Sequence, residues 1–98
     1  MNTLGEASGN RRGAVLEPSA QAALDAAWMR SEAIGERLEE ALDWIEASPP
    51  DPRSRRRRFS SGIWAISIVA AGGDWLILWE DHPDTPQVWF VGESAALG

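Results

Sequence analysis

Residues 62–80 read GIWAISIVAAGGDWLILWE, and this stretch decides the fold. It holds two runs in which large apolar side chains alternate, and the segment AAGGD separates them. Alternation with a period of two is typical of β-strands, and glycines supply the positive φ angles that tight turns require. The stretch therefore predicts a β-hairpin whose turn is formed by GGD at residues 72–74.

Both faces of this predicted hairpin are apolar. In the first strand, one face carries Trp64, Ile66 and Ile68, and the other carries Ile63, Ala65, Ser67 and Val69. In the second strand, Trp75, Ile77 and Trp79 alternate with Leu76 and Leu78. A strand that is apolar on both faces is typical of the centre of a sheet. We expect helices to cover one face and a tail or a partner to cover the other.

The segments on either side complete the predicted fold. QVWFVG at 87–92 follows the turn DHPDTP and predicts a third strand. Before the hairpin, SPPDPRS at 48–54 ends an amphipathic stretch with helical periodicity that begins near Pro18. The residues from Ser31 to Gly35 are the weakest part of that stretch, so two helices are favoured over one long helix. The run GAVLEP at 13–18 predicts a short edge strand.

This order of elements predicts an α+β fold of the type β-α-α-β-β-β. A helical hairpin would pack on a small, mainly antiparallel sheet of four strands. Residues 13–98 are expected to form a single domain, because 98 residues allow one modest core. Residues 1–12 are polar and rich in Gly, Asn and Ser, and they predict a disordered N-terminal tail.

Composition narrows the function classes. The chain has no cysteine, which excludes disulfides, thiolate zinc sites and cysteine nucleophiles. No apolar run approaches the ~20 residues of a membrane helix, and the first residues lack the apolar core of a signal peptide. We therefore expect a cytoplasmic protein with no membrane contact. Neither a cofactor nor a metal is predicted, and His82 in EDHPD is read as part of a turn rather than as a metal ligand.

The positive charge is gathered in one segment of an acidic chain. The formal net charge is −6, yet five of the nine arginines are Arg53, Arg55, Arg56, Arg57 and Arg58. They are expected in the loop between the helical hairpin and the sheet. Three interpretations stay open: a solvated loop that balances the acidic helices, a contact with an acidic partner, and a contact with nucleic-acid phosphates. The acidic body argues against nucleic acid, because such binders present a broad basic face.

Four tryptophans of the predicted strands are further candidates for partner or phosphate binding. They are Trp64, Trp75, Trp79 and Trp89. Aromatic side chains on a sheet can stack with nucleic-acid bases. These strands carry no arginine or lysine near the tryptophans to contact the phosphates. Core packing is the favoured interpretation, and a partner-binding groove is the alternative.

The chain resembles the RelE/ParE toxin superfamily, the toxins of bacterial type II toxin–antitoxin pairs. The similar segments are VLEPSAQAAL, LEEALDWIEASPPDP, FSSGIWAISI and DWLILWE, which lie within residues 14–92. GIWAISI is most similar to the GLWELRI-like strand of the HigB branch. The resemblance implies a toxin neutralised by a cognate antitoxin. ParE-like members act on DNA gyrase, whereas RelE-like and HigB-like members cleave mRNA on the ribosome.

The nuclease branch implies cationic residues that this sequence replaces. Ser67 or Ala65, depending on the register, stands where that branch has a strand arginine, and WLILW stands where YRIxY is frequent. The tail GESAALG lacks a late His, Arg, Lys or Tyr. We therefore expect a toxin-like protein that binds a protein target, with DNA gyrase as the expected target by analogy with ParE. A ribosome-dependent endoribonuclease and a non-toxic, partner-binding descendant are the alternatives, so enzymatic activity stays open.

Overall fold

The computed structural model describes residues 13–47, 51–55, 57–58, 62–82 and 84–96. The predicted N-terminal tail at 1–12 lies outside these residues. The elements along the chain are β1 (Val15–Leu16), α2 (Pro18–Arg30), α3 (Glu32–Glu46), the 3-10 helix η1 (Pro52–Arg55), β2 (Arg57–Arg58), β3 (Ile63–Ala70), β4 (Gly73–Glu80), β5 (Gln87–Glu93) and the 3-10 helix η3 (Ser94–Ala96). The predicted α+β fold with a helical hairpin is confirmed.

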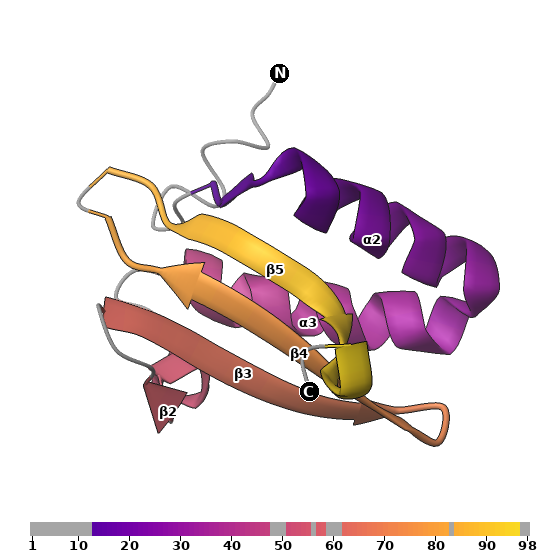
Figure 1. Ribbon diagram of the computed structural model, residues 1–98. Coiled ribbons are helices and arrows are strands. Elements are labelled where there is room, and N and C mark those ends of the chain that lie inside the picture. Colours follow the sequence, from indigo (N-terminus) through magenta and orange to yellow (C-terminus); the bar gives the residue numbers. More distant parts are fainter. Residues whose placement is uncertain (1–12, 48–50, 56, 59–61, 83, 97–98) are drawn as a thin grey trace.

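The sheet has the strand order β1-β5-β4-β3-β2 (Figure 1). The strands β3, β4 and β5 form the predicted antiparallel meander, and β4 is central. The edge strand β1 pairs in parallel with β5, so the sheet is mainly antiparallel. The expected four strands are joined by a fifth, β2, because Arg57 and Arg58 pair with Ala65 and Trp64. The expectation that all five clustered arginines lie in a loop was therefore wrong for these two.

The helical hairpin turns at a single residue, Ser31. Pro18 occupies the first turn of α2, where its missing N–H costs nothing, and the Glu17 carboxylate accepts hydrogen bonds from Ser19. Ser31 is extended (φ −164°, ψ 125°), donates its N–H to the Ala27 carbonyl and accepts from the Gly35 N–H. One long helix is thereby excluded, as predicted.

The turn between β3 and β4 is displaced by one residue from the prediction. It consists of Ala71 (φ 52°) and Gly72 (φ 79°), and Gly73 already pairs with Ala70. Positive φ at both central residues identifies a type I′ turn, which matches the twist of the flanking strands. Because the side-chain period of a strand is two, this turn fixes which residues of β3 and β4 face the helices.

The core lies between the helical hairpin and one face of the sheet. Figure 1 shows α3 behind the strands and α2 along the β5 side. The core residues of the sheet are Ile66, Ile68, Ala70, Trp75, Ile77, Trp79, Val88 and Val91. The core residues of the helices are Ala20, Leu24, Ala27, Ile34, Leu38, Ala41, Leu42 and Ile45. The helices follow the predicted period of about 3.6 residues and the strands the period of two, except that the register shift in β5 separates Val88 and Val91 by three residues. None of the described helices is long and apolar enough to cross a membrane.

Candidate functional site

The first part of the arginine segment is held against the protein itself. Arg53 donates through Nε and Nη2 to the two carboxylate oxygens of Asp51, at 3.0 and 2.8 Å. Its guanidinium also lies 4.5 Å from the centre of the Trp44 ring. The hydrogen bond that Arg53 donates to the Asp51 carboxylate raises the pKa of Arg53 above its ordinary value. Nε, Nη2 and one face of the Arg53 guanidinium are therefore already engaged within the protein.

The other described arginines of the segment belong to two different elements. Arg55 ends η1 and is exposed. Arg57 and Arg58 form β2 at the sheet edge, and Arg56 lies outside the described residues. The four described arginines of the segment therefore divide between the 3-10 helix η1 and the edge strand β2.

A buried hydrogen bond beneath Arg53 fixes this segment to the core. The Trp79 indole N–H donates to the Ser54 carbonyl at 2.8 Å, and both residues are fully buried. The Ser54 hydroxyl donates to the Asp51 carbonyl at 2.7 Å, and the Asp51 carboxylate accepts from the Arg53 N–H at 2.8 Å. Asp51 and Ser54 were not predicted as anchors. The run Asp-Pro-Arg-Ser at 51–54 could have indicated them, because an Asp side chain that accepts a hydrogen bond from the N–H two residues later forms a common turn.

The four candidate tryptophans are not brought together as one binding surface. Trp79 is fully buried and Trp75 is 5% exposed, both on the face of the sheet that the helices cover. Neither ring can stack with a base in this fold, so the structure places both in the core. Trp64 is half-buried and packs against the core. Trp89 is 43% exposed and donates to the Glu80 carboxylate at 3.1 Å. It is the extra residue of β5 at the register shift, because Val88 pairs with Trp79 and Phe90 pairs with Leu78.

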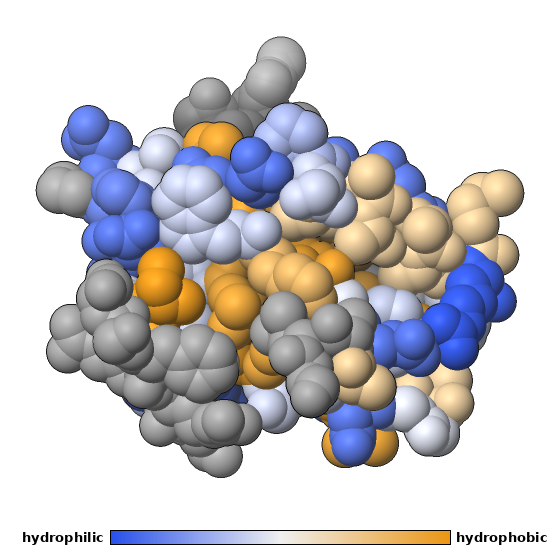
Figure 2. Space-filling view, in the orientation of Figure 1, coloured by the Kyte–Doolittle hydropathy of each residue, from blue (hydrophilic) through white to orange (hydrophobic). Residues whose placement is uncertain are grey.

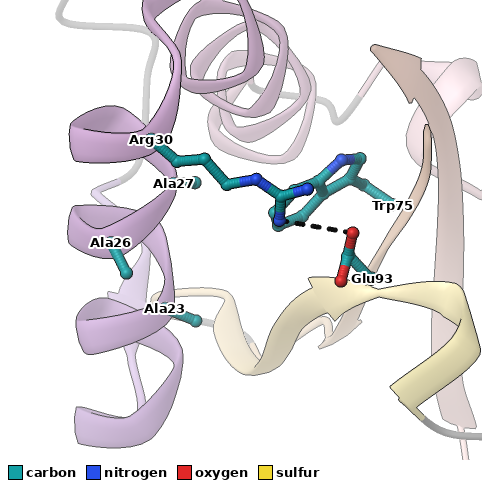
Figure 3. A pocket seen from close by; sticks show the side chains of 6 residues that line it. All are labelled: Ala23, Ala26, Ala27, Arg30, Trp75 and Glu93. Atoms are coloured by element: carbon teal, nitrogen blue, oxygen red, sulfur yellow. Dashed lines mark hydrogen bonds and ion pairs between the residues drawn. The ribbon is translucent and has the colours of Figure 1, made fainter. Parts of the chain in front are cut away.

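A small pocket of about 220 Å³ opens between α2 and the ends of β4 and β5 (Figure 3). Ala23, Ala26 and Ala27 form one wall, and Trp75 lies opposite. Arg30 reaches across the pocket, 5.7 Å from the centre of the Trp75 ring, and pairs with Glu93 at 3.3 Å. The volume is below the ~300–1,000 Å³ of typical small-molecule sites. The pocket therefore matches a single apolar side chain better than a substrate.

The second face of the sheet is the largest candidate surface. We call it the open face. It comprises the residues of β3, β4 and β5 that alternate with the core set: Ile63, Ala65, Ser67, Val69, Asp74, Leu76, Leu78, Glu80, Gln87, Phe90 and Gly92. Figure 2 shows apolar side chains gathered at the centre of this side of the molecule. Ala65 and Leu76 are buried, and η3 packs against β4, whereas Val69 is 67% exposed.

The three long strands give the open face a negative charge. On β3, β4 and β5 its charged members are Asp74 and Glu80, and these strands contain no arginine, lysine or histidine. At the edge of the sheet, Arg57 of β2 pairs with Ala65 of this face. Ala65 and Ser67, the alternative positions of the strand arginine in the resembling nucleases, both lie on this face. A phosphate backbone approaching it would meet carboxylates and apolar groups. The arrangement is suited to a protein surface.

His82 lies beside Glu80 at the end of β4, with Nε2 3.4 Å from Oε1. Within the described part of the chain, no group of three His, Asp or Glu side chains is placed to hold a metal ion.

Comparison of the chain with family models, curated proteins and solved structures gave no match.

Proposed function

We propose that this protein is the toxin-like component of a type II toxin–antitoxin pair. It acts by binding a protein target, DNA gyrase by analogy with ParE, and a cognate antitoxin neutralises it. Three features of the chain support this proposal: the resemblance of its segments, the order of its elements and the character of the open face. The open face is the observation that carries it.

The open face favours a protein target over RNA for an electrostatic reason. Phosphate contacts supply most of the affinity for nucleic acids, and they require cations on the binding surface. On β3, β4 and β5 the open face has acids and apolar side chains instead, and Arg53 is already paired with Asp51. Apolar surface with an aromatic residue at its edge is typical of protein interfaces.

Trp89 provides a specific point of contact. Its indole is 43% exposed and lies beside Glu80, at the end of the open face. Tryptophans are enriched among the residues that dominate binding energy at interfaces, and truncation of such a residue costs about 2 kcal/mol or more. We therefore expect Trp89 to contact the target or the antitoxin.

The test combines growth with gyrase activity. The protein is induced alone in a bacterial host, and purified protein is titrated into a DNA supercoiling assay with gyrase. We expect growth arrest, intact mRNA and inhibited supercoiling, and Trp89→Ala should weaken the inhibition at least about tenfold. Met29→Ala is the matched control, because Met29 is also an exposed apolar residue but lies on α2.

Each alternative has its own outcome. Growth arrest with rapid mRNA loss would favour the ribosome-dependent endoribonuclease. Arrest without either effect would reject gyrase as the target and retain a toxin. Normal growth, together with no inhibition of gyrase at micromolar protein, would leave only the partner-binding descendant and would overturn the proposal.

A further inference from the structure

The outer edge of β3 is only partly paired. The strand β4 pairs with β3 from Ile63 to Ala70, whereas β2 pairs with it only at Trp64 and Ala65. Among the described residues, no strand borders Ile66–Ala70 on that outer side. Figure 1 shows this part of β3 as the free border of the sheet, beyond β2.

The type I′ turn determines which backbone groups point outward along this edge. In a two-residue hairpin the flanking residues, here Ala70 and Gly73, form a hydrogen-bonded pair. Because bonded and non-bonded pairs alternate, Ile66 and Ile68 also direct their N–H and C=O groups toward β4. The N–H and C=O groups of Ser67 and Val69 therefore point away from β4, into the free edge.

The 3-10 helix η1 also packs against β3, but the sequence of this edge offers little protection against pairing. Residues 66–70 read ISIVA, with neither a charge nor a proline. Ser67 is exposed and Val69 is 67% exposed. Charged side chains, prolines or covering segments normally prevent such an edge from pairing with another chain.

We propose that a second copy of this chain pairs antiparallel with β3 across a two-fold axis at Ile68. Ser67 of each copy then lies opposite Val69 of the other, and their outward N–H and C=O groups bond to one another. A two-fold axis at Ser67 would instead oppose Val69 to Ala65, whose outward groups pair with β2. An axis at Val69 would oppose Ser67 to Ala71, which has left the strand.

The length of the free edge agrees with this register. In the register centred on Ile68, Ala71 lies opposite Ala65 of the second copy. At that position β3 turns away into its hairpin, and the β2 strand of the second copy begins. The pairing therefore extends over Ile66–Ala70 in both copies. In each copy, the outward N–H and C=O groups of Ser67 and Val69 form hydrogen bonds.

The dimer should be weak and strengthened by salt. The interface is short and belongs to the class that buries less than about 1,200 Å², which is typical of transient contacts. Each copy carries a formal charge of −6, so the two copies repel one another. The paired edge is itself uncharged, and added salt screens the repulsion of the remaining charges.

Sedimentation equilibrium of the full chain, from micromolar to millimolar concentration, tests the inference. Val69→Pro removes an outward N–H without removing a bond to β4, and Ser67→Lys adds a charge to the edge. We expect the wild type to dimerise and each variant to weaken the dimer at least about tenfold. The matched controls Ser67→Thr and Met29→Lys should leave the dimer unchanged, and the tryptophan fluorescence of every variant should report an intact core.

A wild-type chain that stays monomeric at high salt over the whole range would overturn the proposal, and the edge would then belong to another protein. A dimer that persists in Ser67→Lys would overturn it as well, even if Val69→Pro failed to fold. The inference does not depend on the proposed function, because neither toxicity nor gyrase enters the measurement.

Discussion

The two faces of the sheet are built from the same kinds of residue and have different roles. On the helix-covered face, Trp79, Ile77 and Val88 are fully buried beneath α2 and α3. On the open face, Val69 is largely exposed, and Leu78 and Phe90 are half-buried. Composition alone therefore does not decide what a strand residue does. The helical hairpin decides it, by covering one of two apolar surfaces.

The difference between the faces should appear most strongly at two neighbours on β4. Ile77→Ala deletes a fully buried side chain at the centre of the core, and we expect a loss of about 2–5 kcal/mol in the free energy of unfolding. Leu78→Ala truncates the adjacent, half-buried side chain on the open face and should cost roughly 1 kcal/mol or less. Urea denaturation followed by tryptophan fluorescence measures both. Equal losses would mean that the open face is also covered in solution.

Trp79 and Trp89 allow the same comparison for a hydrogen bond, because one indole N–H is buried and the other is exposed. Trp79→Phe leaves the buried Ser54 carbonyl without its donor, which should cost about 1–3 kcal/mol. Trp89→Phe removes an exposed bond to Glu80 and should change stability by less than about 0.5 kcal/mol. Trp79→Phe should also speed amide exchange in η1, because the indole is what holds Ser54 to the core. Unchanged exchange there would show that the Asp51 contacts suffice.

The strands and the central place of β4 could be predicted from the sequence, whereas the Ser54 anchor, β2 and the free edge of β3 could not, for physical reasons. Alternation gave the strands, and apolar residues on both faces of 75–79 placed β4 at the centre. The Ser54 anchor was missed because the acceptor is a backbone carbonyl, which every residue possesses. Arg57 and Arg58 were expected in the loop that joins the helical hairpin to the sheet, yet edge strands commonly carry charge. The free edge of β3 could not be predicted either, because it depends on how far β2 pairs along β3.

The helical layer offers a prediction that depends on one close contact. A Cβ added at Gly35 would lie 2.2 Å from the Trp28 ring, which covers this glycine in the hairpin. Gly35→Ala should therefore destabilise by roughly 1–3 kcal/mol, in spite of the better helix propensity of alanine. In a Trp28→Ala background, the same change should become neutral or stabilising, by up to ~1 kcal/mol. Thermal unfolding of the four chains measures this, and additive effects would contradict the contact.

Substitutions in the turn between β3 and β4 should have the smallest effect on the free energy of unfolding. Ala71 adopts a φ of 52°, which costs a residue with a Cβ roughly 1 kcal/mol compared with glycine. Ala71→Gly should therefore stabilise the protein by about 0.5–1 kcal/mol, although glycine also gains freedom in the unfolded chain. Chemical denaturation with an unchanged m-value checks the gain and shows that the register of β3 and β4 is kept.

The reciprocal change at Gly72 separates the backbone effect from packing. Gly72 has a φ of 79°, and nothing lies within 4 Å of a Cβ built there. Gly72→Ala should therefore lose about 1 kcal/mol through the backbone alone. If both substitutions were neutral, the turn would not be of type I′, and the outward direction of Ser67 and Val69 would lose its basis. Opposite signs at the two positions would support both the turn and the free edge that follows from it.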